Sequence, residues 1–314
     1  MNITRIRLLV SGLRRQKKMY CALDSDLAKE NHRAAELSRF SHSIEKGLAI
    51  DNPRLGFGHD KQKKMMQLII SLETSKSSYH KEVCLIALDT LKEYIEFHRS
   101  KSYSDEMCEE IESFLKTHWI CHSGKYGGIK EVKKTDCLFD RLVIEDFFHS
   151  RHSIRDFSDQ DVDDAVLIKA LKLAQYAPSA CNRQGVRAYV LNKEQSKEYA
   201  KRLEGVGGFA DKATRLILIT AKLSAYRQDE SFQYIVSAGI YAAYLSLTLH
   251  TYGLAGCVIQ RQVTWSKEWE DKRTSLGIPE DEQIILLFAV GNMKDKFNVP
   301  ISHRLQNEEM IRFL

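Results

Sequence analysis

The chain has 314 residues, 43% of them apolar, and a formal net charge of +5 at pH 7. This length is typical of two compact units or of one unit with a long extension, and the apolar content is ample for a core. The modest charge gives no case for a nucleic acid partner. Seven cysteines without a Cys-x-x-Cys pair indicate free thiols in a reducing compartment, so we expect a cytoplasmic protein without a disulfide framework or a metal site.

The N-terminal residues 1–18 carry six basic residues and no acidic one. Their apolar stretch, Leu8–Val10, is too short for a secretory signal, and no run in the chain is long enough to span a bilayer. The pattern favours a solvated helix packed through Ile6, Leu9 and Leu13. The alternative is an amphipathic helix that rests on an anionic membrane.

Helical spacing of apolar residues continues through the first half of the chain. We expect helices at Leu27–Leu48, Lys61–Leu72, Lys81–His98 and Ser104–Trp119. They predict a helical region over residues 1–140, as a small bundle or an arm. The stretch Gly124–Lys134, rich in glycine and lysine, is the predicted linker.

One polar cluster in this half stands out. Arg39, His42 and Lys46 lie three and four residues apart, so they share one face of a helix. A bound anionic substrate would explain the cluster. A charged face with internal ion pairs also explains it, and this is the interpretation we favour.

The next informative segment begins at Arg151. Arg151, Ser153 and Arg155 alternate along the chain, so in an extended segment their side chains share one face. Two guanidinium groups and a hydroxyl on one face suit a phosphate, because arginine binds it through paired, charge-assisted hydrogen bonds.

A helix and a polar loop follow this segment. Asp163 is a natural N-cap for the helix, and Pro178 stops it. Beyond the proline, Ser179, Asn182 and Gln184 offer both donors and acceptors on a loop. A cation pair followed by an amide-bearing loop suits a ligand with a phosphate end and a polar heterocyclic end.

After Gln184 the pattern alternates between strands and helices. We expect strands at Val186–Leu191, Leu216–Thr220, Cys257–Gln260 and Gln283–Val290, and helices at Glu194–Glu204, Ser231–Tyr252 and Trp265–Leu276. The last strand is nearly all apolar, so we place it in the centre of the sheet. The predicted fold class is α+β, with a mixed sheet flanked by helices over residues 141–314.

The residues Arg-His-Ser-Ile-Arg-Asp-Phe at 151–157, followed one helix later by Ala-Pro-Ser-Ala-Cys-Asn-Arg-Gln at 177–184, resemble the opening of the nitroreductase-like flavoprotein family. The resemblance covers roughly the second half of the chain. It implies an FMN-dependent oxidoreductase that uses hydride from NAD(P)H to reduce a small organic substrate, or uses the flavin to dehydrogenate one. It also implies a homodimer with FMN at each of two interfaces.

The resemblance further implies which residues hold FMN. From the two motifs these are Arg151, His152, Ser153, Arg155, Pro178, Ser179, Ala180, Asn182 and Gln184. The turn at Gly256, Cys257 and Val258 corresponds to a backbone contact with the flavin N5, and Arg304 in the tail to a basic residue at the flavin phosphate. No side chain is expected to act as a covalent nucleophile.

Departures from the family pattern bear on the activity. Gly185 and Val186 replace the usual Pro-Trp, and the lid insertion near Lys222–Gln233 is short, so we expect FMN binding but not broad nitroaromatic activity. The helical half is then expected to cover the site. Two alternatives stay open: a flavoenzyme with other chemistry, such as dehydrogenation or reductive removal of a substituent, and a non-enzymatic FMN-binding or regulatory protein whose helical half recruits a partner. The sequence gives neither the substrate nor the choice between NADH and NADPH.

Overall fold

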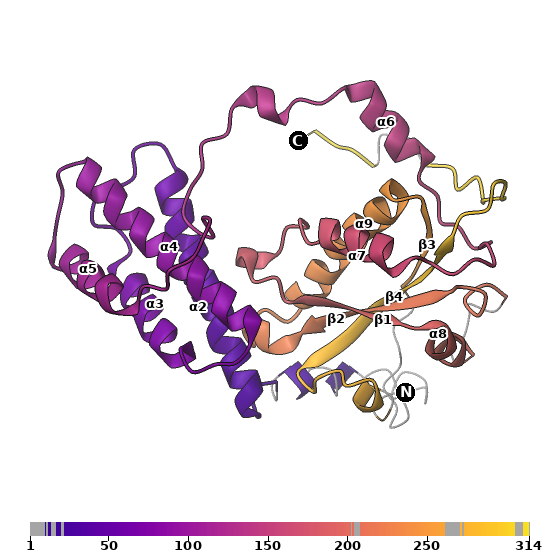
Figure 1. The fold of residues 1–314 in the computed structure, drawn as a ribbon, viewed down its shortest axis with the longest axis horizontal. Helices are drawn as coiled ribbons and strands as arrows, with labels where there is room; N and C mark the ends of the chain where they lie inside the picture. Colours follow the sequence, from indigo (N-terminus) through magenta and orange to yellow (C-terminus); the bar gives the residue numbers. More distant parts are fainter. Residues whose placement is uncertain are drawn as a thin grey trace.

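The structure is a computed structural model. It describes residues 10, 12–13, 17–19, 22–201, 203, 208–260, 271, 273–304 and 310–313. A helical half and a sheet half lie side by side, and an arm arches from one to the other (Figure 1). Most of the two helices predicted over residues 1–18 and 265–276 lies outside the described residues.

Over residues 22–130, the helical half contains four α-helices close to the predicted positions. They are α2 (Asp26–Ala49), α3 (His59–Leu72), α4 (Ser78–Ser100) and α5 (Glu106–His118). Side-chain caps define two of their starts, because Ser25 accepts a hydrogen bond from the Ala28 N–H and Asp105 accepts one from the Cys108 N–H. Their apolar faces meet in one core that includes Leu37, Ile44, Met65, Leu88, Tyr94 and Ile111. No helix in the described part of the chain is long and apolar enough to cross a membrane.

Two glycines of the predicted linker, Gly127 and Gly128, pack against this bundle. The Tyr126 and Gly127 N–H groups donate to the Asp89 carboxylate over 2.6 and 3.3 Å, and the Gly128 N–H donates to Glu45 over 3.1 Å. A Cβ on Gly127 would lie 2.1 Å from the Ile86 carbonyl oxygen, so only glycine permits this approach. The exposed connection therefore begins only at about residue 130.

The arm, residues 130–150, contains η1 (Lys134–Cys137) and α6 (Arg141–Ser150). The Asp140 carboxylate caps α6 by accepting hydrogen bonds from the Leu142 and Val143 N–H groups. Every residue of the arm is exposed except Phe147, which is partly buried. Large apolar side chains are among the exposed ones, with Leu142 62% and Val143 63% exposed.

The described residues of the sheet half form four strands in the order β1-β2-β4-β3, and neighbouring strands are antiparallel. The strands are β1 (Val186–Leu191), β2 (Arg215–Lys222), β3 (Leu254–Ile259) and β4 (Glu282–Asn292). The predicted α+β class is confirmed, and β4 occupies an internal position as expected. The described strands form an antiparallel sheet and not the mixed sheet that was predicted.

Helices cover both faces of this sheet. They are α7 (Asp164–Ala174) and α9 (Gln233–Thr251) on one face and α8 (Lys193–Ala200) on the other (Figure 1). Side chains alternate between the two layers, so Ile217 and Ile219 pack with α7 and α9, whereas Leu216 and Leu218 pack on the side of α8. Burial on both faces explains the continuous apolar runs of the central strands.

The two halves are joined by direct packing. Helix α2 packs against η2 (Ala180–Asn182) and η3 (Leu223–Ala225). A buried polar network accompanies this contact: Asn31 Nδ2 donates to Asp281 over 3.1 Å, and the Ser224 hydroxyl donates to the same carboxylate. The His32 ring also contacts the Ser224 carbonyl oxygen over 2.9 Å. The segment predicted as a short lid is therefore the place where the helical half docks.

Candidate functional site

The cationic segment lies along the free edge of the sheet. The Ile154 N–H donates to the Gly256 carbonyl oxygen over 3.2 Å, and the Ser158 N–H donates to Asn292 over 2.9 Å. Ile154 is only 2% exposed and anchors the segment in the core. Since β3 is an edge strand, its outer side is open to this pairing. The fold thus brings the Arg151–Arg155 motif beside Gly256, as the predicted site requires.

The two arginines of this segment have no carboxylate partner among the described residues. Arg155 donates to the Ser153 carbonyl oxygen over 3.3 Å and lies 5.7 Å from the centre of the Phe209 ring. In contrast, Arg183 and Arg215 in the same half are paired with carboxylates at 2.5–3.1 Å. Unpaired guanidinium groups on one edge fit an anionic ligand, and a phosphate in particular.

Two titratable side chains near these arginines, His250 and Cys257, have pKa values shifted toward their neutral forms. Burial lowers the pKa of His250, and the nearby Arg151 and His152 act in the same direction. Burial also raises the pKa of the Cys257 thiol, although Arg155 opposes the shift. The thiol is therefore protonated near neutral pH.

The polar loop after α7 has an unusual backbone. Cys181, Asn182 and Gln184 adopt positive φ angles of 51°, 51° and 48°, in a region that costs non-glycine residues on the order of 1–3 kcal/mol each. Ser179 organises the loop, since its carbonyl oxygen accepts from the Asn182 N–H and its hydroxyl oxygen accepts from the Gln184 N–H, both over 3.0 Å. The side chains of Asn182 and Gln184 are exposed and have no hydrogen-bond partner among the described residues. They are free to contact a ligand.

Arg183 holds this loop together, and the sequence analysis did not single it out. Its side chain is 1% exposed, the largest of the fully buried side chains in the described chain. Its guanidinium donates to the carbonyl oxygens of Ala180 and Ala225, and two nitrogens pair with Glu230 over 2.7 and 2.9 Å. Nothing local in the sequence indicates this role, because Glu230 belongs to a distant segment.

The glycine-containing turn differs in detail from the prediction. Gly256, Cys257 and Val258 lie within β3 and pair with β4, and the positive φ of 68° is at Gly253. Gly256 packs closely against α9, since a Cβ there would lie 3.0 Å from the Leu249 Cδ1 atom. Sequence alone could not distinguish a turn from a strand here, because these residues form a strand only through their pairing with β4.

The remaining predicted cofactor residues are accessible. Pro178 is exposed and Ala180 is half-buried next to the loop. Arg304 is exposed in the tail after β4, where it donates to the Ser302 carbonyl oxygen. Its convergence with Arg151 and Arg155 on one phosphate stays a prediction.

Two of the three suggested substrate residues lie beside carboxylates of the same helix. Arg39 binds Glu36 through two hydrogen bonds of 2.8 and 2.6 Å, and His42 lies 3.5 Å from Glu45. Lys46 is exposed. This arrangement is the internal pairing that we favoured from the sequence. Hydrogen bonding to Glu36 raises the pKa of Arg39.

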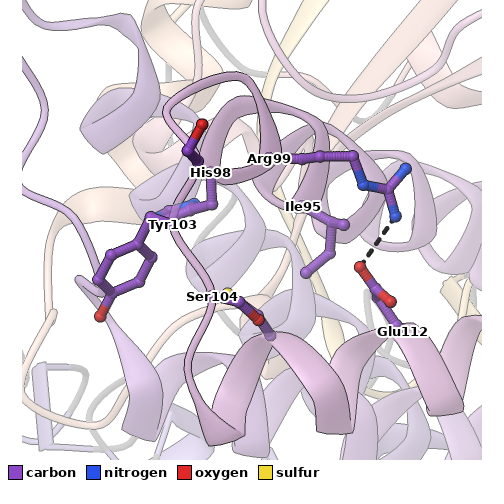
Figure 2. Close-up of a pocket in the computed structure, with 8 residues that line it drawn as sticks. Ile95, His98, Arg99, Tyr103, Ser104 and Glu112 are labelled. Atoms are coloured by element: carbon purple, nitrogen blue, oxygen red, sulfur yellow. Dashed lines mark hydrogen bonds and ion pairs between the residues drawn. The ribbon is translucent and has the colours of Figure 1, made fainter.

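A separate pocket of about 210 Å³ opens in the helical half (Figure 2). Its lining is Ile95, His98, Arg99, Ser102, Tyr103, Ser104, Cys108 and Glu112. The polar groups in it are largely paired with protein: Arg99 binds Glu112 over 2.9 Å, and His98 accepts from the Gly56 N–H and contacts the Tyr94 carbonyl oxygen. Burial raises the pKa of the Cys108 thiol to about 11. The predicted cofactor residues lie elsewhere, so we do not assign this pocket to the function.

Comparison with known proteins agrees with the motifs. Residues 149–207 match the model of the nitroreductase family, which confirms the resemblance over this part of the chain. None of the curated proteins matches the chain.

Several solved structures are similar to this chain over about half of its length. They include a nitroreductase family protein from Streptococcus pneumoniae TIGR4 (22% identity, 55% of this chain and 100% of that chain, TM-score 0.47), an FMN-dependent nitroreductase from Clostridium difficile R20291 (26% identity, 53% and 96%, TM-score 0.45) and a nitroreductase-like protein from Streptococcus mutans (20% identity, 55% and 98%, TM-score 0.45).

Proposed function

We propose that the protein is an FMN-dependent oxidoreductase that uses NAD(P)H and acts on a small organic substrate. One observation carries the proposal: Arg151 and Arg155, inside the region that matches the nitroreductase family, have no carboxylate partner among the described residues and lie beside Gly256 on an open sheet edge. Bound FMN would supply hydride-transfer chemistry, and the chain would supply binding, orientation and shielding from water.

The described residues suit both ends of such a cofactor, its phosphate and its polar ring. Arg151, Ser153 and Arg155 would hold its phosphate, with Arg304 from the tail as a third cation. The exposed amides of Asn182 and Gln184 would hydrogen-bond its polar ring edge. The helical half, which docks through α2 next to the polar loop, would limit access of water and large substrates.

We also propose that the protein acts as a homodimer. Helix α9 is apolar on nearly all sides, yet Phe232 before its first turn is 73% exposed and Val236 within it is 51% exposed. A helix with apolar residues all round is normally buried. The exposed apolar side chains of α6 add to this unpartnered surface, and a second copy of the chain would cover both.

The direct test is an FMN titration of the wild-type protein and of Arg151→Ala, Arg155→Ala and the double variant. Each single substitution should weaken binding about tenfold or more, because a charge-assisted hydrogen bond contributes roughly 1.5–3 kcal/mol. Arg99→Ala is the matched control, since it removes an exposed arginine of the helical half that pairs with Glu112. Equal affinity in the double variant and the wild type would contradict the phosphate-site assignment.

A second measurement separates an enzyme from a binding protein. The FMN-loaded protein should oxidise NADH or NADPH in the presence of an acceptor, and the preferred nucleotide would be read from the rates. Failure to oxidise either nucleotide with every acceptor of a broad panel would favour the non-enzymatic, FMN-binding alternative.

A further inference from the structure

The polar loop Ser179–Gln184 is held from two opposite sides, one of which belongs to the helical half. Three of its six residues adopt the left-handed backbone conformation without being glycine. Such a conformation persists only where the surrounding contacts impose it. The residues that impose it therefore also control how Ser179, Asn182 and Gln184 are presented to a ligand.

The inner side is the buried Arg183 side chain. It binds the loop to itself through Ala180, and to the segment after β2 through Ala225 and Glu230. Its guanidinium also stacks 4.9 Å from the centre of the Tyr226 ring. Five contacts of one side chain thus fix the middle of the loop on the sheet half.

The outer side is Tyr79 in the first turn of α4. Its hydroxyl donates to the Arg183 carbonyl oxygen over 3.0 Å. The helical half therefore binds the backbone of Arg183, while the sheet half binds the Arg183 side chain. The Tyr79 ring also lies near two cations, with Arg187 at 5.0 Å and Lys222 at 5.5 Å from its centre. Helix α2 of the same half also packs on this loop, against η2.

We propose that Tyr79 and Arg183 are positioning residues for this loop, and that the helical half thereby sets the affinity of the cofactor site on the sheet half. Tyr79 does not touch the ligand in this account; it acts through the Arg183 backbone. This inference rests on the proposed FMN site. It gives the helical half a defined task, which the sequence left open.

The test uses Tyr79→Phe in the full chain, because this change removes one hydroxyl and keeps the ring near its two cations. Tyr103→Phe is the matched control: it removes a hydroxyl that donates over 2.9 Å to Asp105 within the helical half, away from the loop. Three quantities are compared: the FMN dissociation constant, the free energy of unfolding, and hydrogen–deuterium exchange of peptides covering residues 179–185 in the FMN-free protein.

We expect Tyr79→Phe to weaken FMN binding about fivefold, since one hydrogen bond to the loop is lost. Exchange of the loop peptides should rise in Tyr79→Phe and not in Tyr103→Phe, even where both variants lose similar stability. Glu230→Gln, which loosens the inner anchor, should produce the same two effects and serves as a second variant.

The possible failures are distinguishable. If the wild type binds FMN but Tyr79→Phe binds it equally well, the inference is wrong and the proposed function stands. If the wild type does not bind FMN at all, the proposed function is wrong, and the loop exchange alone then decides whether Tyr79 holds the loop. Unchanged exchange in both Tyr79→Phe and Glu230→Gln would overturn the positioning role.

Discussion

The Arg183–Glu230 pair shows how a single residue shapes the candidate site. Burial alone would raise the pKa of Glu230, but hydrogen bonds from Arg183 and from the Arg227 N–H outweigh burial, so the pKa lies below its ordinary value. A depressed carboxyl pKa means that the folded state favours the charged form. The pair therefore stabilises the fold at pH values above the ordinary glutamate pKa near 4.5. This contribution is lost as the pH falls through the lower pKa of the folded state.

Substitution of Glu230 tests this directly. At pH 7, Glu230→Gln should lower the free energy of unfolding by roughly 2 kcal/mol, because the buried guanidinium loses its counter-charge. The difference from wild type should shrink as the pH is lowered below 4.5, as measured by chemical denaturation across a pH series. Glu112→Gln, in the exposed pair with Arg99, should cost about 0.5 kcal/mol or less. A constant difference at all pH values would contradict the assignment.

At this scale, sequence reasoning succeeds where the chemistry is local and fails where it depends on distant pairing. The alternation of Arg151, Ser153 and Arg155 is visible along the chain, and so is their suitability for a phosphate. The burial of Arg183 is not visible, because its partners Ala225 and Glu230 come from another segment. Tyr79 was missed for the same reason.

At the scale of elements, helices were easier to predict than strand ends. The apolar spacing of α4 is a local property, so its position followed from the sequence. The sequence placed the start of β3 at Cys257, whereas the strand begins at Leu254, because pairing with Asn292 and Gly291 extends it into a stretch that resembles a turn. Likewise, the glycines at 127 and 128 suggest a linker, but they let the chain pack closely against α4.

The exposed apolar face of α9 predicts that a charge placed there prevents dimerisation. Val236→Arg should convert a dimer into monomers, because the charge would be desolvated in the proposed interface. Sedimentation velocity at several protein concentrations measures the change. Thr117→Arg, at an exposed position of α5 in the helical half, is the control and should leave the assembly state unchanged. A wild-type protein that is monomeric at all concentrations would refute the proposed dimer.

At the scale of the whole molecule, the two halves share a buried polar network. Asp281 accepts from Asn31 of α2 and from Ser224 of η3, and the Asn31 amide oxygen also contacts the ring of the fully buried His80 over 3.0 Å. Groups from both halves depend on this one carboxylate. The halves should therefore unfold together, although the sequence predicts two separate regions.

Asp281→Ala tests this coupling. It leaves two buried donors without their acceptor and should lower the free energy of unfolding by about 2 kcal/mol or more. In the wild type, one cooperative transition should be seen by circular dichroism and by calorimetry, whereas the variant should show a broader or divided transition. Two separate transitions already in the wild type would show that the halves fold independently.

The measurement that tests the central claim most directly is the titration of the purified protein with FMN, followed by its flavin absorbance and fluorescence. We predict saturable binding to the wild type and a loss of at least a hundredfold in affinity when Arg151 and Arg155 are both replaced by alanine, since two charge-assisted contacts are removed. A wild-type protein that stays colourless after incubation with FMN, or a double variant that binds as tightly as the wild type, would contradict the account.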